Sequence, residues 1–362
     1  MLVSKKAQNI TPYTSGEQPQ GYVCLKLNTN ENAYPPSPQI KQYLLTADIC
    51  NLRLYPDPNN NKLKCAIADS LGIEPDNIFV GNGSDEVLAL AFLTYFEKTR
   101  GRLLMPDITY SFYPVYANLY DIQFESVPLD IDFGIRIDDY INKARKGKVC
   151  GIIFANPNAP TGILLSLSEI ERLLIECPDV PVVVDEAYID FAHEGASAIS
   201  LLSKYPNLIV VRTFSKSHSL AGARVGYCAA STFLINALGR IKDCFNSYPL
   251  DRISADIAAI SIADKDYSTE VVGKIVSTRG RTASKLKEFG CKILSSGANF
   301  LFVSIPGMTG QAVYRYLKDR YILVRNWSTG RIADFVRITI GTDEDMDILI
   351  GHIQELCLKK TF

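Results

Sequence analysis

Residues 208–216 read LIVVRTFSK, an apolar β-branched run that ends in a serine and a lysine. Such a run is typical of a strand buried within a parallel sheet. Lysine is normally a solvated surface charge, but Lys216 follows this strand directly. Burial disfavours the ammonium form, and the neutral amine can form a Schiff base with an aldehyde and later carry protons. The stretch therefore predicts a buried strand that delivers a reactive lysine.

Two other apolar runs also end in polar groups. Residues 150–155 lead into NPNAPTG at 156–162, and residues 180–184 end at Asp185. The pattern SEIERLLI at 168–175 predicts a helix between them with a serine cap, so the unit is predicted to be βαβ. The carboxyl ends of parallel strands form the ligand crevice of an open α/β sheet. We therefore expect these polar groups to meet in one pocket.

The size and charge of the chain favour an enzyme. The 362 residues exceed what one core usually organises, so we expect a large domain and a smaller one. The 38 basic and 39 acidic residues are mixed along the sequence, so the sequence indicates no basic patch that would bind nucleic acid or an anionic membrane. We find no membrane-spanning run, and residues 1–6 are not followed by the apolar segment of a secretion signal. We therefore expect a cytoplasmic location.

Cysteine and histidine give no sign of a disulfide framework or a metal site. Nine cysteines, from Cys24 to Cys357, contain no CxxC pair, which fits reduced cytosolic thiols. His193, His218 and His352 do not cluster with cysteines. We expect no bound metal.

The order of patterns along the chain predicts three parts. Residues 1–37 are rich in turn-forming residues and are predicted to form an extended arm. Residues 38–255 alternate helical and strand patterns, as expected for a large doubly wound α/β domain with a mostly parallel sheet. Residues 256–362 are predicted to form a smaller α+β domain. The later patterns are a long helix over about 251–289, strands at 299–303, 322–325 and 335–341, and a closing helix after Thr342.

A glycine-rich turn in the stretch VGNGSDEVLAL, at 80–90, opens a predicted helix. Free backbone N–H groups at such a terminus bind anions, and glycines let a phosphate approach. The other interpretation is that Ser84 is an ordinary N-cap, with Asp85 and Glu86 complementing the helix dipole. Arg224 favours a phosphate site, because its guanidinium offers a planar fork among small residues. With a Schiff-base lysine, such a cradle indicates pyridoxal phosphate.

Six motifs carry a family resemblance. They are LNTNEN at 27–32, RLYPDP at 53–58, GSDE at 83–86, DEAY at 185–188, SKS at 215–217 and RITIGT at 337–342. In this order they resemble the histidinol-phosphate aminotransferases, a family of fold-type I, class II pyridoxal-phosphate-dependent transferases. The similarity runs from about Asn9 to the C-terminus. It implies the fold-type I architecture, with a large domain, a small domain and an arm.

The resemblance implies roles around the cofactor ring. Lys216 would bind pyridoxal phosphate covalently and act as the acid–base group. Asp185 would keep the pyridine nitrogen protonated, which makes the ring an electron sink. Tyr188 would donate to the phenolic oxygen and Tyr110 would stack on the ring. From the residues alone, either tyrosine could instead pack in a core.

The resemblance also implies how the cofactor phosphate is held. Ser84, Asp85, Ser215 and Arg224 would bind it, the first two largely through backbone N–H groups. Tyr55 would reach the phosphate from the neighbouring subunit. This implies a homodimer with shared sites.

Two positions depart from the usual pattern. Aminotransferases usually place an asparagine before Pro-Thr-Gly to bond the phenolic oxygen, but this chain has Ala159 there. Asn156 or Asn158 could supply the amide, and we favour Asn156 because it is nearer the strand end. His218 stands where an apolar or aromatic residue often follows the lysine, and we interpret it as a packed or locally bonded ring.

The resemblance places the substrate between the arm and the small domain. Arg337 would receive an anionic group, since its fork suits the carboxylate of glutamate. Histidinol phosphate has no carboxylate, so its phosphate would occupy this site with further help. The helpers implied by the family are Arg325, Tyr13 and Tyr55, and further candidates that line the pocket are Asn30 and Asn299. Without the resemblance, Arg325 would more often be a surface charge at a strand end, and amides in arms and loops commonly satisfy backbone groups.

The implied reaction transfers the amino group of L-histidinol phosphate to 2-oxoglutarate in histidine biosynthesis, in two half-reactions. Imidazole acetol phosphate and glutamate are the products. An aromatic amino acid aminotransferase and a threonine-phosphate decarboxylase remain alternatives, because their motifs are similar. A cofactor-binding regulator would need a DNA-binding module, and this chain has neither the spare length nor a basic segment for one.

Overall fold

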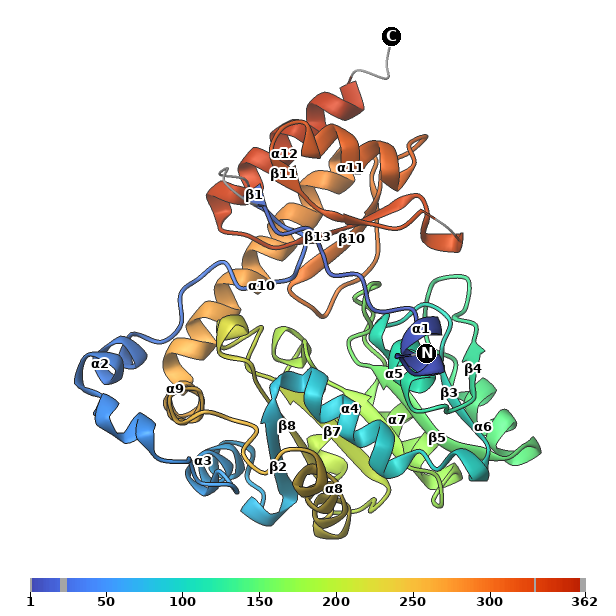
Figure 1. Ribbon diagram of the computed structural model, residues 1–362. Helices are drawn as coiled ribbons and strands as arrows, with labels where there is room; N and C mark the ends of the chain where they lie inside the picture. Colours follow the sequence, from blue (N-terminus) through green and yellow to red (C-terminus); the bar gives the residue numbers. More distant parts are fainter. Residues whose placement is uncertain (1, 20–24, 329, 359–362) are drawn as a thin grey trace.

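The computed structural model describes residues 2–19, 25–328 and 330–358, and a seven-stranded sheet forms its larger part (Figure 1). The strands, in sheet order, are β2 (Ile78–Asn82), β8 (Val225–Ala230), β7 (Leu208–Thr213), β6 (Val182–Asp185), β5 (Val149–Ala155), β3 (Arg102–Pro106) and β4 (Phe124–Val127). Strand β8 is antiparallel to both neighbours, and the remaining pairs are parallel. This confirms the predicted mostly parallel sheet.

Helices cover both faces of this sheet, because successive strand residues point to opposite sides. Val183 and Ile209 pack into one apolar cluster, and Val182 and Val210 pack into another across the sheet. The helices of the first cluster are α4 (Gly83–Tyr95), α5 (Phe112–Leu119) and α8 (Thr232–Phe245), and those of the second are α6 (Ile137–Lys146) and α7 (Leu167–Glu176). The sheet is therefore doubly wound, as predicted.

A third group of helices packs beside β2 and β8 and leads to the smaller part. These helices are α2 (Pro38–Thr46), α3 (Asn61–Leu71) and α9 (Arg252–Ala263), and α10 (Lys265–Glu288) follows α9 directly. The prediction of one continuous helix over 251–289 is wrong at Asp264. That residue leaves the helical conformation, and its side chain caps α10 by accepting from the Tyr267 N–H.

The smaller part contains a four-stranded antiparallel sheet with α10 beside it (Figure 1). Its strands, in sheet order, are β12 (Arg325–Asn326), β13 (Phe335–Thr339), β10 (Phe300–Ser304) and β9 (Lys292–Ile293). Helices α11 (Gly310–Lys318) and α12 (Asp343–Leu358) complete this part. The predicted strands at 299–303 and 335–341 and the closing helix are confirmed, whereas 322–325 is split between β11 (Ile322–Leu323) and β12.

The N-terminal arm contacts both parts of the molecule. Its helix α1 (Lys5–Asn9) lies against the larger part, where the Lys6 ammonium donates to the Leu119 carbonyl at 2.7 Å. Its strand β1 (Leu25–Lys26) pairs in parallel with β11 of the smaller part. The arm is therefore positioned to line a site between the two sheets.

Two observations concern membrane spans and the state of the cysteines. In the described ranges, no helix combines the length and the apolar character needed to cross a membrane. The eight cysteines of those ranges are free thiols, whereas Cys24 lies outside them.

Candidate active site

The carboxyl ends of β5, β6 and β7 open into a cavity of about 390 Å³. The arm and β12–β13 close its other side, so residues far apart in sequence share one wall. The predicted site residues that line it are Tyr13, Ser84, Asp85, Tyr110, Asp185, Tyr188, Ser215, Lys216, Arg224, Arg325 and Arg337. Those that do not line it are Asn30, Tyr55, Asn156 and Asn299.

Asp185 ends β6 and is almost completely buried, with 4 % of its surface exposed. Its Oδ2 accepts from the Tyr113 hydroxyl at 2.8 Å and its Oδ1 accepts from the Ala187 N–H at 3.1 Å. Burial raises the pKa of Asp185 to about 6, although both hydrogen bonds oppose this rise. A cation beside the carboxylate, such as a protonated pyridine nitrogen, would restore its ionised form.

Lys216 follows β7 on an irregular turn. Its Nζ donates to the Thr29 carbonyl at 3.2 Å and lies 5.7 Å from the centre of the Tyr188 ring. The Asn32 amide donates to the carbonyls of Lys216 and Ser217, at 2.9 and 3.3 Å. The arm therefore contacts both the amine and the backbone of this lysine.

The turn into α4 forms a cradle at one end of the cavity. Gly83 has φ +78°, a left-handed conformation that favours glycine, and a Cβ there would displace the Arg224 Nη2, which would lie 2.6 Å away. Arg224 itself adopts a left-handed φ of 54° and pairs with Asp85 at 2.9 Å. Asp85 also accepts from the Tyr110 hydroxyl at 3.0 Å.

The free N–H groups of α4 at Ser84, with the Ser215 side chain and Arg224, form a donor set suited to a phosphate. The N-cap of α4 is Asn82 and makes no side-chain cap bond, so Ser84 is not the N-cap. A lysine, a buried carboxyl group and this cradle in one cavity fit pyridoxal phosphate.

Two arginines face the opposite end of the cavity. Arg337 donates to the Asn28 carbonyl at 3.0 Å, its Nε is buried without a partner, and burial lowers its pKa. Arg325 donates to the carbonyls of Thr14 and Ser15 at 3.3 and 3.4 Å. Within residues 2–19, 25–328 and 330–358, neither arginine pairs with a carboxylate. These two cations are therefore available to an anionic ligand.

Two of the predicted amides lie behind the cavity wall. Asn30, with a left-handed φ of 55°, donates to the Tyr188 hydroxyl at 2.9 Å and accepts from Thr339 at 3.0 Å. Asn299 donates to the Asn30 carbonyl at 3.1 Å. Both side chains are buried and contact protein groups.

Asn156 is fully buried, and its amide exchanges two hydrogen bonds with the backbone of Leu165, at 2.7 and 3.2 Å. The prediction that Asn156 contacts a phenolic oxygen has no counterpart in this geometry. Asn158 donates to Ile108 and Thr161 instead, and the methyl group of Ala159 lines the cavity.

Tyr55 is 79 % exposed and stacks on Tyr248, with ring centres 4.6 Å apart. It lies outside the cavity of its own chain. His218 packs on Phe214, and its Nδ1 lies 3.0 Å from the Ser261 hydroxyl, as the interpretation of a packed or bonded ring expects.

Sequence reasoning missed Tyr113 and Phe112. Tyr113, on α5, is buried and donates its hydroxyl to Asp185. Phe112 lines the cavity and stacks on Tyr13, with ring centres 4.1 Å apart. The only signal was the aromatic run that begins at Tyr110, which suits core packing equally well.

Comparisons with known proteins agree with this geometry. Residues 22–353 match the family model of the class I and II aminotransferases. The histidinol-phosphate aminotransferase 2 of Thiobacillus denitrificans is 50 % identical over 349 residues, which cover 96 % of each chain. The chain belongs to the histidinol-phosphate aminotransferase family, within the class I and II aminotransferases. The histidinol-phosphate aminotransferase of Brachyspira hyodysenteriae is 47 % identical over 98 % of both chains.

Solved structures extend the family assignment to the cofactor. The histidinol-phosphate aminotransferase of Sinorhizobium meliloti, solved in complex with pyridoxal-5'-phosphate, superposes with a TM-score of 0.84 at 27 % identity. The match covers 92 % of this chain and 91 % of that one. The aminotransferase described here is a pyridoxal-phosphate enzyme. An aromatic aminotransferase from Pyrococcus horikoshii shares the fold at 23 % identity and a TM-score of 0.80.

Proposed function

We propose that this aminotransferase moves the amino group of L-histidinol phosphate to 2-oxoglutarate, as a step of L-histidine biosynthesis. The observation that carries the proposal is the pair of guanidinium groups, Arg325 and Arg337, that face one cavity without a carboxylate partner. A phosphate ester carries more negative charge than a carboxylate and has more acceptor oxygens, so it engages two arginine forks. Arg337 alone suits the smaller anion of the second substrate.

The chain's own side chains provide the proton transfers. Pyridoxal phosphate supplies an electron sink for the charge left at the substrate Cα and carries the amino group between substrates. The Lys216 amine, which lines the cavity, would move the proton from Cα. Asp185 would hold the pyridine nitrogen protonated, and Tyr188 would donate to the phenolic oxygen. Because Asn30 already donates to the Tyr188 oxygen, the tyrosine proton is free to point into the cavity.

The other groups would bind without reacting. Ser84, Asp85, Ser215 and Arg224 would hold the cofactor phosphate, with Tyr110 against the ring. Asp85 would act through its N–H, since its carboxylate is paired with Arg224. At the substrate end, Tyr13 would join the arginines, with Asn30 and Asn299 supporting that wall from behind.

We also propose a cytoplasmic homodimer. Its support is an exposed apolar surface at the end of α2 and in the following 3-10 helix, Ile49–Arg53. Leu45 is 74 % exposed, Ile49 71 % and Leu52 54 %, next to Tyr55. Apolar patches of this kind mark interfaces in soluble proteins. Residues 1–37, 38–255 and 256–362 are the proposed arm, large domain and small domain. The second boundary falls within α9, whose buried residues pack with β2 and β8.

A half-reaction series tests the proposed substrate. Purified holoenzyme is mixed separately with histidinol phosphate, phenylalanine and threonine phosphate, and the cofactor absorbance is followed over time. Rapid amino transfer at low concentrations of histidinol phosphate, with the other two slow, is expected. Faster transfer from phenylalanine would make the chain an aromatic aminotransferase. Release of carbon dioxide from threonine phosphate would make it a decarboxylase. The Lys216→Ala variant is the control for covalent chemistry.

A further inference from the structure

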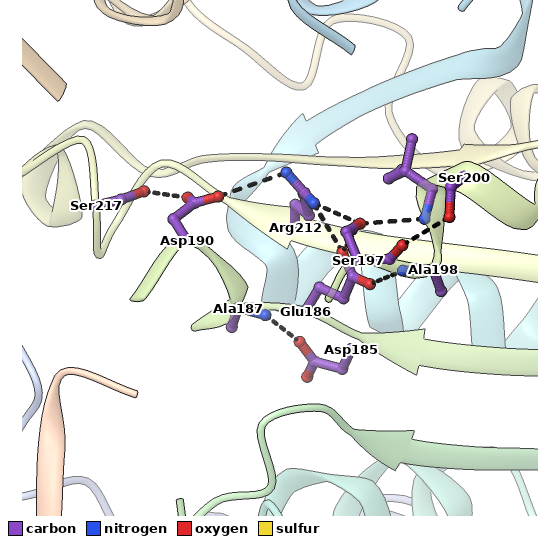
Figure 2. Close-up of polar contacts among 10 residues, drawn as sticks. Asp185, Glu186, Ala187, Asp190, Ser197, Ala198, Ser200, Arg212 and Ser217 are labelled. Carbon is purple, nitrogen blue, oxygen red and sulfur yellow. Dashed lines mark hydrogen bonds and ion pairs between the residues drawn. The ribbon is translucent and has the colours of Figure 1, made fainter. Parts of the chain in front are cut away.

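A charge network lies behind the active site, on the far side of β6 and β7 (Figure 2). It is buried at Glu186 and Arg212 and reaches solvent at Asp190. At its centre is Arg212, whose side chain is 12 % exposed. Its guanidinium donates twice to Glu186, at 3.0 and 2.9 Å, and once to Ser197 at 2.7 Å. It also lies 3.5 Å from Asp190. Two carboxylates on one segment are therefore tied to one arginine on the next strand.

The alternation of side chains along the strands separates this network from the reacting groups. Asp185 lines the active-site cavity, whereas the next residue, Glu186, points away from it. Thr213 likewise lines the cavity, whereas Arg212 does not. Asp185 and Thr213 thus each have a neighbour that belongs to the network on the opposite face.

The network continues to the segment that carries the lysine. The Ser217 hydroxyl donates to Asp190, and Ser217 follows Lys216 directly. The Glu186 carboxylate also accepts from the Ala198 N–H at 2.6 Å and from the Ser197 hydroxyl at 2.7 Å. The segments 185–190 and 215–217 are therefore joined through charged hydrogen bonds as well as through the sheet.

Stability alone is a weak reason for such an arrangement. Desolvation of a buried ion pair offsets most of its attraction, so well-packed apolar residues often serve equally well. A guanidinium fork, in contrast, fixes both the distance and the angle of its partners. Catalysis depends on such geometry, since a displacement of about 1 Å can slow a reaction about 100-fold.

We propose that Arg212 is a positioning residue that sets the placement of Asp185 and Tyr188 relative to Lys216. It acts on the first segment through Glu186 and Asp190, and on the second through the hydrogen bond from Ser217 to Asp190. The inference rests on the proposed roles of Asp185, Tyr188 and Lys216.

Two further titratable groups face Arg212. Tyr227 on β8 lies close enough to interact electrostatically with it, and burial raises the pKa of this tyrosine to about 12. Burial lowers the pKa of His218. Both groups are therefore neutral near pH 7, and the charges of the network are those of Arg212, Glu186 and Asp190.

The test compares Arg212→Met, Arg212→Lys and the wild type as holoenzymes. Methionine removes the charge and the fork, whereas lysine keeps the charge but lacks the planar fork that bonds Glu186 and Ser197. In substrate-free protein, the pH midpoint of the cofactor absorbance is expected to shift by roughly half a unit or more in both variants. Both half-reactions should slow about tenfold or more, with little change in KM. Arg281→Met is the matched control, because Arg281 also bridges two carboxylates, Asp343 and Asp347, on the surface of the smaller part.

Two results would overturn the proposal. One is a wild-type pH midpoint with wild-type half-reaction rates in Arg212→Met. The other is a shift in the methionine variant that lysine removes completely, which would make Arg212 a source of charge and not of geometry. If Arg212→Met fails to fold, Ser217→Ala decides, since it removes one hydroxyl of the network, and an unchanged midpoint there counts against the proposal. Because the midpoint is measured without substrate, it remains decisive even if the preferred amino donor is not histidinol phosphate.

Discussion

Asp185 combines a buried carboxyl group with two hydrogen bonds that favour its charged form. Burial prevails and raises its pKa from 3.8 to about 6. Between these values the folded, cofactor-free protein binds more protons than the unfolded chain, so its unfolding free energy falls as pH rises. A protonated pyridine nitrogen would reverse this penalty. Asp185 is thus suited to a cationic partner, and its burial lowers the unfolding free energy of the cofactor-free protein.

The first prediction concerns this penalty. In the cofactor-free protein, Asp185→Asn should remove a loss of stability on the order of 3 kcal/mol that the wild type suffers between about pH 4 and pH 6. Urea unfolding of both proteins at several pH values measures the difference, so that contributions from other carboxylates cancel. Parallel stability curves for the two proteins would contradict the raised pKa.

The second prediction separates the two arginines of the substrate end. Arg325→Ala should slow the half-reaction with histidinol phosphate roughly 10- to 100-fold, because a charged hydrogen bond to the phosphate is lost. The glutamate half-reaction should change far less, since Arg337 remains. Single-turnover kinetics of the same variant with both substrates provide an internal control. Equal losses in the two half-reactions would remove the assigned role of Arg325.

At the scale of elements, β8 and α4 meet without room for a side chain. A Cβ on Gly226 of β8 would lie 2.2 Å from the Ser84 backbone nitrogen and 2.4 Å from the Gly83 carbonyl carbon. Backbone atoms cannot rotate away as a flexible side chain can. The strand therefore sets the position of the helix terminus that forms the phosphate cradle.

The third prediction follows from this contact. Gly226→Ala should push α4 away, destabilise the protein by roughly 1–3 kcal/mol and weaken cofactor binding at least about tenfold. Denaturant unfolding and titration of the cofactor measure the two effects. Gly351→Ala, in α12 with nothing within 4 Å of the added Cβ, is the control and should be neutral or stabilising by up to about 1 kcal/mol. Unchanged cofactor affinity in Gly226→Ala would show that α4 tolerates the displacement.

The elements that sequence patterns located best are those with strong local signals. The strands β5, β6 and β7 are mostly apolar runs. Asp185 is the last residue of β6, and Lys216 lies just past the end of β7 at Thr213. Other features depend on contacts that no local pattern encodes. Tyr113 meets Asp185 across 72 residues, and Asn30 meets Tyr188 across 158. The break at Asp264 was missed because its cap lies within a stretch that is helical on both sides.

At the scale of the whole molecule, the arm links the two parts and reaches the reactive lysine. Its strand β1 extends the smaller part, and its residues Thr29 and Asn32 bond the amine and the backbone carbonyl of Lys216. The smaller part is therefore connected through the arm to both ends of this residue. The sequence predicted an arm of this composition but not which groups it contacts.

The last prediction concerns the proposed sharing of sites between two subunits. Tyr55 is exposed and lies outside its own cavity, so its proposed role requires a second copy of the chain. Tyr55→Ala and Lys216→Ala homodimers should each be weakly active or inactive. When the two variants are unfolded and refolded together, activity should return to about one quarter of the wild-type value, because half of the dimers are mixed and each mixed dimer has one intact site. Analytical ultracentrifugation checks that dimers form, and a mixture kept folded and separate is the control. A refolded mixture with only the summed activity of its components would place Tyr55 outside the site of the partner subunit.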